Sequence, residues 1–281
     1  MAKNSRRIFV KQLTTLAAVS GVPLSPAKRA GKGSEKGNIN GTKVPTIGSQ
    51  EYAPPMSPGE LKIDYRGMSC FIITASNGTR IITDPFCADD YILHPELEKE
   101  AANVVTVSCG NYAHCYVWAI GGMPYIFKRI APAEIEGIRF RGVATRHLEM
   151  KEVGSTRPDL NIVVCFEVEG MKICHLGALG HRLSDEQAKE IGMVDILMTP
   201  VGGVSTLPLK EVDMVCDQLN PKIILPMHFR SERCTYSSWA TVDDFLKSKK
   251  NALKFRGFGV KTFKSANLPS ERQIVALGYP H

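Results

Sequence analysis

Residues 161–178 read NIVVCFEVEGMKICHLGA and carry the clearest structural signal in the chain. Asn161–Val168 and Met171–Cys174 are apolar and rich in β-branched residues, and Glu169-Gly170 between them is typical of a tight hairpin turn. His175 directly follows the second run. This stretch therefore predicts a buried β-hairpin that places a histidine at the carboxyl end of a strand.

Similar short apolar runs occur on both sides of this hairpin. Strands are expected at Leu61–Tyr65, Cys70–Ala75, Arg80–Thr83, Val104–Val107, Ile138–Ala144, Asp195–Thr199 and Lys222–Met227. Helices are expected at 91–102, from the N-cap Ser184 to Ile191, and at Leu209–Leu219. The first half consists mostly of hairpins and the second alternates strand and helix. This mixture predicts an α/β (α+β) fold of two packed sheets with helices outside.

The N-terminal segment has a different character. Residues 5–11 read SRRIFVK, a weakly apolar run follows, and Ser25-Pro26-Ala27 offers a signal-peptidase site. This pattern resembles a twin-arginine export signal, although a basic tail is the alternative. We expect a twin-arginine signal peptide at 1–27, a flexible basic linker at 28–50 and one domain at 51–281. The expected location is then periplasmic or extracellular.

The formal net charge of +7 is concentrated in these first segments. Residues 1–27 and residues 28–50 each carry +4, which leaves −1 for the remainder. A nearly neutral domain argues against a nucleic-acid partner. The chain also lacks a run of about 18 apolar residues, so no transmembrane segment is expected.

Four of the seven histidines lie at or after the ends of predicted strands: His114, His147, His175 and His228. Any one of them alone is more typical of a hydrogen-bonded loop histidine. However, α/β architectures gather their functional groups at the carboxyl ends of strands. The shared position indicates a metal or acid/base cluster.

Six motifs in order resemble the metallo-β-lactamase fold superfamily. They are IDYRGMS at 63–69, ITDPF at 82–86, the loop after Val107, HLGA at 175–178, TPVGG at 199–203 and PMHF at 226–229. Within it, the sequence is most similar to the metal-dependent hydrolases that include ascorbate-6-phosphate lactonases and N-acyl-phosphatidylethanolamine phospholipases. The resemblance implies a four-layer αββα sandwich.

The superfamily's metal motifs are altered in this chain. Where members have H-x-H-x-D-H, residues 109–114 read CGNYAH, so Cys109, Asn111 and Ala113 replace two histidines and an aspartate. The aspartate of H-x-G-D, which bridges two metals, is Ala178 here. A two-metal site is therefore not expected. The resemblance leaves one Zn²⁺ on Cys109, His114, His147 and His228, or no metal at all.

Other residues of the expected pocket have structural alternatives. Free cysteines are often small buried hydrophobes, and this interpretation of Cys109 stands beside its role as a ligand. A third interpretation is a nucleophile with His114 or His147 as its base. Asp84 is expected to fix a loop, and His175 matches a histidine that is usually not a ligand. Gly202 and Gly203 would let a substrate approach the backbone or would simply form a tight turn.

Two functions remain open from the sequence. In the first, the protein is a hydrolase in which one metal supplies hydroxide for attack on an ester, lactone or phosphodiester. In the second, it is a catalytically lapsed family member that binds a small-molecule ligand or a partner. After export, one or two disulfides could form among the remaining cysteines, whose pairing the sequence does not define.

Overall fold

The computed structural model describes residues 56–88, 97, 100–148, 160–234, 236–255 and 259–278. The chain divides into two units, Met1–Glu51 and Tyr52–His281, and the described residues all belong to the second. The predicted signal peptide, the linker and most of the predicted helix 91–102 lie outside these ranges. Among the described helices, none has the length and apolar character needed to cross a membrane.

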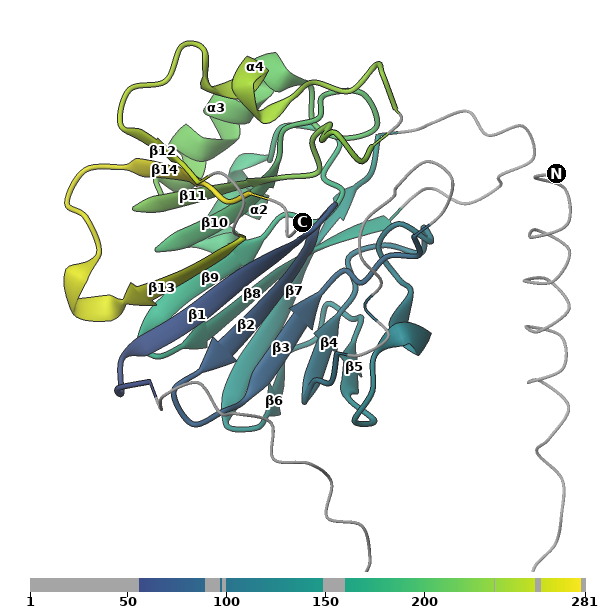
Figure 1. Ribbon diagram of the computed structural model, residues 1–281, viewed down its shortest axis with the longest axis vertical. Coiled ribbons are helices and arrows are strands. Elements are labelled where there is room, and N and C mark those ends of the chain that lie inside the picture. Colours follow the sequence, from purple (N-terminus) through teal and green to yellow (C-terminus); the bar gives the residue numbers. More distant parts are fainter. Residues whose placement is uncertain are drawn as a thin grey trace, which may run out of the picture. The chain divides into compact units, whose positions relative to one another are not determined.

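The first sheet has six strands in the order β13-β1-β2-β3-β4-β5 (Figure 1). Their bounds are β1 Glu60–Gly67, β2 Cys70–Ala75, β3 Arg80–Thr83, β4 Val104–Thr106, β5 Tyr125–Phe127 and β13 Val260–Lys264. β13, β1, β2 and β3 pair antiparallel, whereas β4 and β5 continue parallel to β3. The carboxyl ends of β3 and β4 therefore lie at the same edge.

The second sheet has eight strands in the order β12-β14-β11-β10-β9-β8-β7-β6 (Figure 1). Their bounds are β6 Ala133–Ile135, β7 Ile138–Arg146, β8 Leu160–Val168, β9 Met171–His175, β10 Ile196–Pro200, β11 Ile223–Met227, β12 Ala252–Lys254 and β14 Gln273–Ala276. β7 and β9 both pair antiparallel with β8, and β9, β10 and β11 are parallel. As a result, the loops after β7, β9, β10 and β11 share one edge of the sheet.

Three α-helices occur in the described ranges: α2 (Asp185–Ile191), α3 (Leu209–Leu219) and α4 (Val242–Leu246). Two short 3₁₀ turns, Val117–Ala119 and Ser265–Asn267, accompany them. α2 starts with a capping box in which Ser184 and Gln187 satisfy each other's backbone N–H groups. α3 ends at Asn220, whose left-handed conformation terminates the helix.

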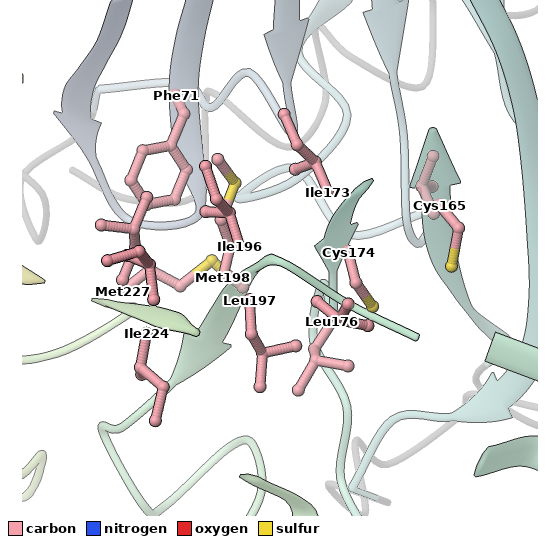
Figure 2. Packing of buried hydrophobic residues seen from close by; sticks show 14 of the residues in the cluster. Phe71, Cys165, Ile173, Cys174, Leu176, Ile196, Leu197, Met198, Ile224 and Met227 are labelled. Carbon is pink, nitrogen blue, oxygen red and sulfur yellow. The ribbon is translucent and has the colours of Figure 1, made fainter. Parts of the chain in front are cut away.

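The main core lies between the two sheets and under the helices. Figure 2 shows part of it, with Phe71 from β2 near Ile196, Met198 and Met227 of the second sheet. Because side chains alternate along a strand, Cys70 and Ile72 of β2 point to the opposite face. There they join a smaller cluster with Trp239 and Phe86. The middle of the six-stranded sheet, around β2, is thus buried on both faces.

The two-sheet sandwich and all predicted strands are confirmed, with bounds that differ by at most two residues. The prediction of a helix at 91–102 is wrong for residues 100–102, which the structure describes, because Ala101 forms a β-bridge with Gly121 there. The sequence did not predict β5, β6, β12, β13, β14 and α4. These elements have three to five residues each, too few to show a clear hydrophobic period.

Candidate active site

Asp84 organises the loops at the carboxyl edge of the six-stranded sheet. It directly follows β3, has a left-handed backbone (φ 38°) and is fully buried. Its carboxylate accepts hydrogen bonds from Ser108 N at 2.8 Å, Ser108 Oγ at 2.5 Å and His114 Nδ1 at 2.8 Å. Burial raises the pKa of Asp84, but the nearby His175 and these hydrogen bonds outweigh it and lower the pKa overall. Asp84 is therefore an ionised group that fixes a loop, as the sequence indicated.

His114 is held in one orientation by this carboxylate. Its ring is buried, and because Nδ1 donates to Asp84, Nε2 carries the lone pair. A carboxylate bonded to the second nitrogen is the usual way in which proteins orient a metal-binding histidine. The hydrogen bond to Asp84 therefore leaves Nε2 as the ring nitrogen of His114 that could bind a ligand.

His228 follows β11 and occupies a crowded position. Its backbone is left-handed (φ 52°), and its N–H donates to Met68 O at 2.7 Å. Gly202, in the loop after β10, packs so closely that a Cβ there would overlap the His228 carbonyl oxygen. Gly202 thus serves close packing, and Gly203 (φ 80°) forms the adjoining turn. Both glycines have the structural role that the sequence left open.

The His228 ring belongs to a stack of four rings. It lies 5.3 Å from the His114 ring at an interplanar angle of 12°, and 4.4 Å from the Trp239 ring at 28°. Tyr236 continues the stack, 4.9 Å from Trp239 at 7°. Burial, with the nearby His114, lowers the pKa of His228 well below its usual value, so the imidazole is neutral. Its Nδ1 is buried without a hydrogen-bond partner among the described residues.

The sequence did not identify Trp239 and Tyr236 as residues of the site. Both belong to the loop that follows His228, and aromatic residues in a loop carry no periodic signal. Only their position downstream of PMHF connects them with the site.

His147 belongs to the same site. It follows β7, forms a β-bridge with Leu179, and its Nδ1 donates to Leu148 O at 2.8 Å. That bond leaves the lone pair on Nε2, as in His114. A charge on His147 would lower the pKa of His228, so the two rings are within electrostatic reach. The structure therefore brings His114, His147 and His228 into one neighbourhood.

His175, in contrast, has a structural role. Its Nε2 donates to Ser69 O at 2.8 Å, in the turn between β1 and β2, and the ring is fully buried. Burial lowers its pKa. Thr83 Oγ1 donates to the same carbonyl at 3.0 Å. His175 thus joins the two sheets, in agreement with its expected position outside the ligand set.

Cys109 lies beside Ser108 in the buried part of the site. Burial, followed by the charge of Asp84, raises the pKa of its thiol to about 12. A thiol in this state is protonated at neutral pH, and an activated nucleophile needs a lowered pKa. The structure therefore argues against Cys109 as a nucleophile and is compatible with its role as a small buried side chain.

The backbone of the altered motifs keeps a well-defined arrangement. Asn161 accepts from Ala178 N at 2.8 Å and donates to Leu176 O at 2.9 Å, which holds the HLGA loop. Asn111 accepts from Ala113 N at 2.9 Å and so forms a local turn. The frame of the site is retained, whereas two of its carboxylates are missing.

In type, the side chains at the site would suffice for one metal ion, whereas two carboxylates of a two-metal site are replaced by alanine. Three imidazoles are a known catalytic zinc set, and His114, His147 and His228 carry such rings. A second ion would need carboxylates, but positions 113 and 178 are alanine and Asp84 already accepts three hydrogen bonds. In the part of the chain that the structure describes, no three His, Cys, Asp or Glu side chains are already grouped to hold an ion. The rings of His114 and His228 stack instead of converging.

The chain thus has two packed sheets with histidine-bearing loops at one edge. The model of the Beta-lactamase superfamily domain matches residues 62–228, which is more than half of the chain. The protein belongs to the metallo-β-lactamase superfamily. The predicted superfamily is thereby confirmed.

Individual relatives agree with this assignment. The chain is 26% identical over 207 residues to a UPF0173 protein of Pyrococcus furiosus, covering 66% of this chain and 90% of the relative. It is 24% identical over 193 residues to a UPF0173 metal-dependent hydrolase of Thermoplasma acidophilum, covering 61% and 84%. These relatives are not named as lactonases or phospholipases, so the predicted branch stays a prediction.

Solved structures show the same fold. A proposed Zn-dependent hydrolase of the metallo-β-lactamase superfamily from Thermotoga maritima has a TM-score of 0.62 and 32% identity, and covers 78% of this chain and 99% of its own. A metallo hydrolase from Ignicoccus hospitalis has a TM-score of 0.56 and 16% identity, covers 73% and 99%, and supports the fold alone.

Proposed function

We propose that this protein is a metal-dependent hydrolase that uses one ion, in contrast to the two-metal sites of its superfamily. The ion would be held by His114, His147 and His228, and Zn²⁺ is the metal that suits three imidazoles best. When bound, zinc lowers the pKa of water to near neutrality and polarises the bond to be cleaved. The expected substrate is a small molecule with an ester, lactone or phosphodiester bond.

The observation that supports this proposal best is the hydrogen bond between Asp84 and His114. The buried carboxylate fixes the His114 tautomer so that Nε2 can act as a ligand. The backbone carbonyl of Leu148 fixes the His147 tautomer in the same way, through its hydrogen bond from His147 Nδ1. Burial keeps His228 neutral, which an imidazole ligand must be. Cys109, next to Ser108, remains the fourth candidate ligand, and it would have to lose its proton to bind.

A second function is favoured by the ring stack of His114, His228, Trp239 and Tyr236. Stacked rings do not converge on an ion, and the stack is completed by residues of the loop after β11. In this alternative the protein is catalytically lapsed and the edge of the sandwich binds a ligand or partner without a metal.

Metal content separates the two functions. The full-length protein is stripped with a chelator, dialysed against Zn²⁺ and analysed for bound metal. We expect about one ion per chain, and we expect His114→Ala or His228→Ala to reduce this by at least tenfold. The matched control is His181→Ala. His181 is not one of the three proposed ligands, and its Nε2 accepts a hydrogen bond from Arg146 N. A folded protein that takes up no zinc would exclude the hydrolase proposal and support the lapsed alternative.

Restoring the superfamily motif provides a second test. The variant combines Cys109→His, Asn111→His, Ala113→Asp and Ala178→Asp, and both proteins are assayed with generic lactones and phosphodiesters. The one-metal proposal expects hydrolysis by the native protein itself. Hydrolysis that appears only in the fourfold variant would show that the native site has lapsed.

We also propose export through the twin-arginine route, on the basis of SRRIFVK at residues 5–11. The test replaces Arg6 and Arg7 by Lys and follows the protein in fractionated cells of a bacterium with this pathway. The native chain should reach the periplasm in a shortened form, and the variant should stay in the cytoplasm. Equal distribution of both proteins would overturn this proposal.

A further inference from the structure

Two cysteines face each other in the second sheet, away from the histidine cluster. Cys165 of β8 and Cys174 of β9 are direct partners in the antiparallel register. Figure 2 shows both side chains on the neighbouring strands. Both are free thiols, and both are buried. Residues directly opposite each other share one face of a sheet, so the two sulfur atoms are neighbours.

The turn of the hairpin determines which kind of pair they form. Glu169 (φ 52°) and Gly170 (φ 71°) are both left-handed, as a two-residue type I′ turn requires. Such a turn makes its flanking residues, Val168 and Met171, a hydrogen-bonded pair. Because the two kinds of pair alternate along the strands, Cys165–Cys174 is a non-hydrogen-bonded pair. Its Cα atoms are then about 4.5 Å apart, which lies within the range of disulfides.

The surroundings favour thiol chemistry at Cys165. A hydrogen bond from Cys174 lowers the pKa of Cys165, and the positive charge of Arg141 acts in the same direction. Arg141 is the register partner of Cys165 on β7, so the three side chains form a row across three strands. Arg141 is fixed there by its bond to Ile191 O at 2.9 Å. A cavity of about 210 Å³, lined by both cysteines and Arg141, lies beside the pair.

We propose that Cys165 and Cys174 form a reversible thiol–disulfide site, with an organic disulfide such as oxidised glutathione as the oxidant. The Cys165 thiolate attacks one sulfur of the oxidant, forms a mixed disulfide and releases one thiol. Cys174 then loses its proton, attacks the Cys165 sulfur and releases the second thiol. Two electrons and two protons pass from the protein to the oxidant, which becomes two thiols. This site is independent of the proposed hydrolase function.

The experiment counts thiols in the full-length protein. The native protein is incubated with excess oxidised glutathione, alkylated under denaturing conditions and digested without reduction. From eight cysteines we expect two to be lost, and mass spectrometry should find one linked pair of peptides that contains Cys165 and Cys174. Treatment with dithiothreitol should restore all eight free thiols. Eight remaining thiols, or a link between other cysteines, would overturn the proposal.

Variants assign the two roles. Cys174→Ser should retain one glutathione on Cys165, because the second step cannot occur, and Cys165→Ser should form no linked pair. The control is Cys216→Ser, since Cys216 is also buried and burial raises its pKa to about 12. It should still form the Cys165–Cys174 link. If a serine variant does not fold, the peptide map of the native protein still decides the outcome.

Discussion

Asp84 shows how a single carboxylate organises the candidate site. It is ionised and fully buried, and such a charge is tolerated only when hydrogen bonds compensate for the lost hydration. The two bonds from Ser108 and one from His114 provide that compensation. The residue therefore contributes both to stability and to the orientation of His114.

Replacing Asp84 with Asn should destabilise the protein strongly. The Asn side chain is neutral, and its NH₂ group replaces one of the two carboxylate oxygens that accept hydrogen bonds. At least one of the buried donors on Ser108 and His114 then loses its acceptor. We expect the free energy of unfolding to fall by about 2–4 kcal/mol, measured by urea denaturation. Asp185→Asn, at the exposed start of α2, is the control and should change it by less than about 0.5 kcal/mol. An equal effect of both substitutions would contradict this account of Asp84.

Glu169 predicts a dependence of stability on pH. Its carboxylate accepts hydrogen bonds from Gly59 N at 2.7 Å and Ser76 N at 2.8 Å, in the other sheet's first hairpin. Burial raises its pKa, but these bonds and that from the Ser76 hydroxyl lower it overall, below the ordinary value of 4.5. A lowered pKa stabilises the fold above the ordinary value, and this contribution is lost as the pH falls through the folded-state pKa.

We therefore expect Glu169→Gln to lower the free energy of unfolding by about 1 kcal/mol at pH 7. The difference in unfolding free energy between the two proteins should shrink as the pH falls below about 4.5, and it should vanish below the lowered folded-state pKa, where both proteins carry a neutral side chain. Urea denaturation at several pH values measures this difference in unfolding free energy, with Glu167→Gln as the control. A difference that stays constant down to pH 3 would show that Glu169 acts through packing and not through its charge.

At the scale of elements, the loops after β10 and β11 depend on each other. Gly202 lies against the His228 carbonyl oxygen, and Gly202 O accepts a hydrogen bond from Ala240 N at 2.9 Å. The backbone of the loop after β11 thus leaves no room for a side chain at position 202 in the loop after β10. The position of the His228 ring follows from this contact and from the bond to Met68 O.

Substituting Gly202 by Ala should displace the His228 loop. The new Cβ meets backbone, which cannot rotate away, so we expect a loss of about 2 kcal/mol or more in unfolding free energy. Near-ultraviolet circular dichroism should report the disturbed Trp239 and Tyr236 rings. Gly110→Ala is the matched control, since a Cβ at Gly110 meets nothing within 4 Å. The interpretation fails if the two variants are equally stable.

The same elements show what the sequence could predict. β2, β3 and α3 were predicted with the observed bounds because Asn77-Gly78 and Asn220-Pro221 mark their ends. The histidines were found because they follow apolar strands. The ring stack was not predicted, since Trp239 reaches His228 through tertiary packing. The Asp84–Ser108 bonds also join residues 24 positions apart, and no local pattern encodes such a contact.

At the scale of the whole molecule, we expect the unit Tyr52–His281 to be stable without the first 51 residues. All described core residues, beginning with Leu61, belong to the unit Tyr52–His281. Deleting residues 1–51 should therefore leave the free energy of unfolding within about 0.5 kcal/mol of the full chain. Urea denaturation of both proteins tests this. A clearly less stable shortened chain would show that the N-terminal unit packs on the domain.

The β1–β2 hairpin is fastened to the β8–β9 hairpin at both of its ends. At one end Glu169 binds Gly59 and Ser76, and at the other His175 binds Ser69. Sliding of one sheet over the other would have to break bonds at both ends at once, which opposes shear motion. A ligand arriving at the histidine edge can then be accommodated only by its loops. We therefore expect any ligand-induced change to be confined to those loops, with the two hairpins keeping their relative position.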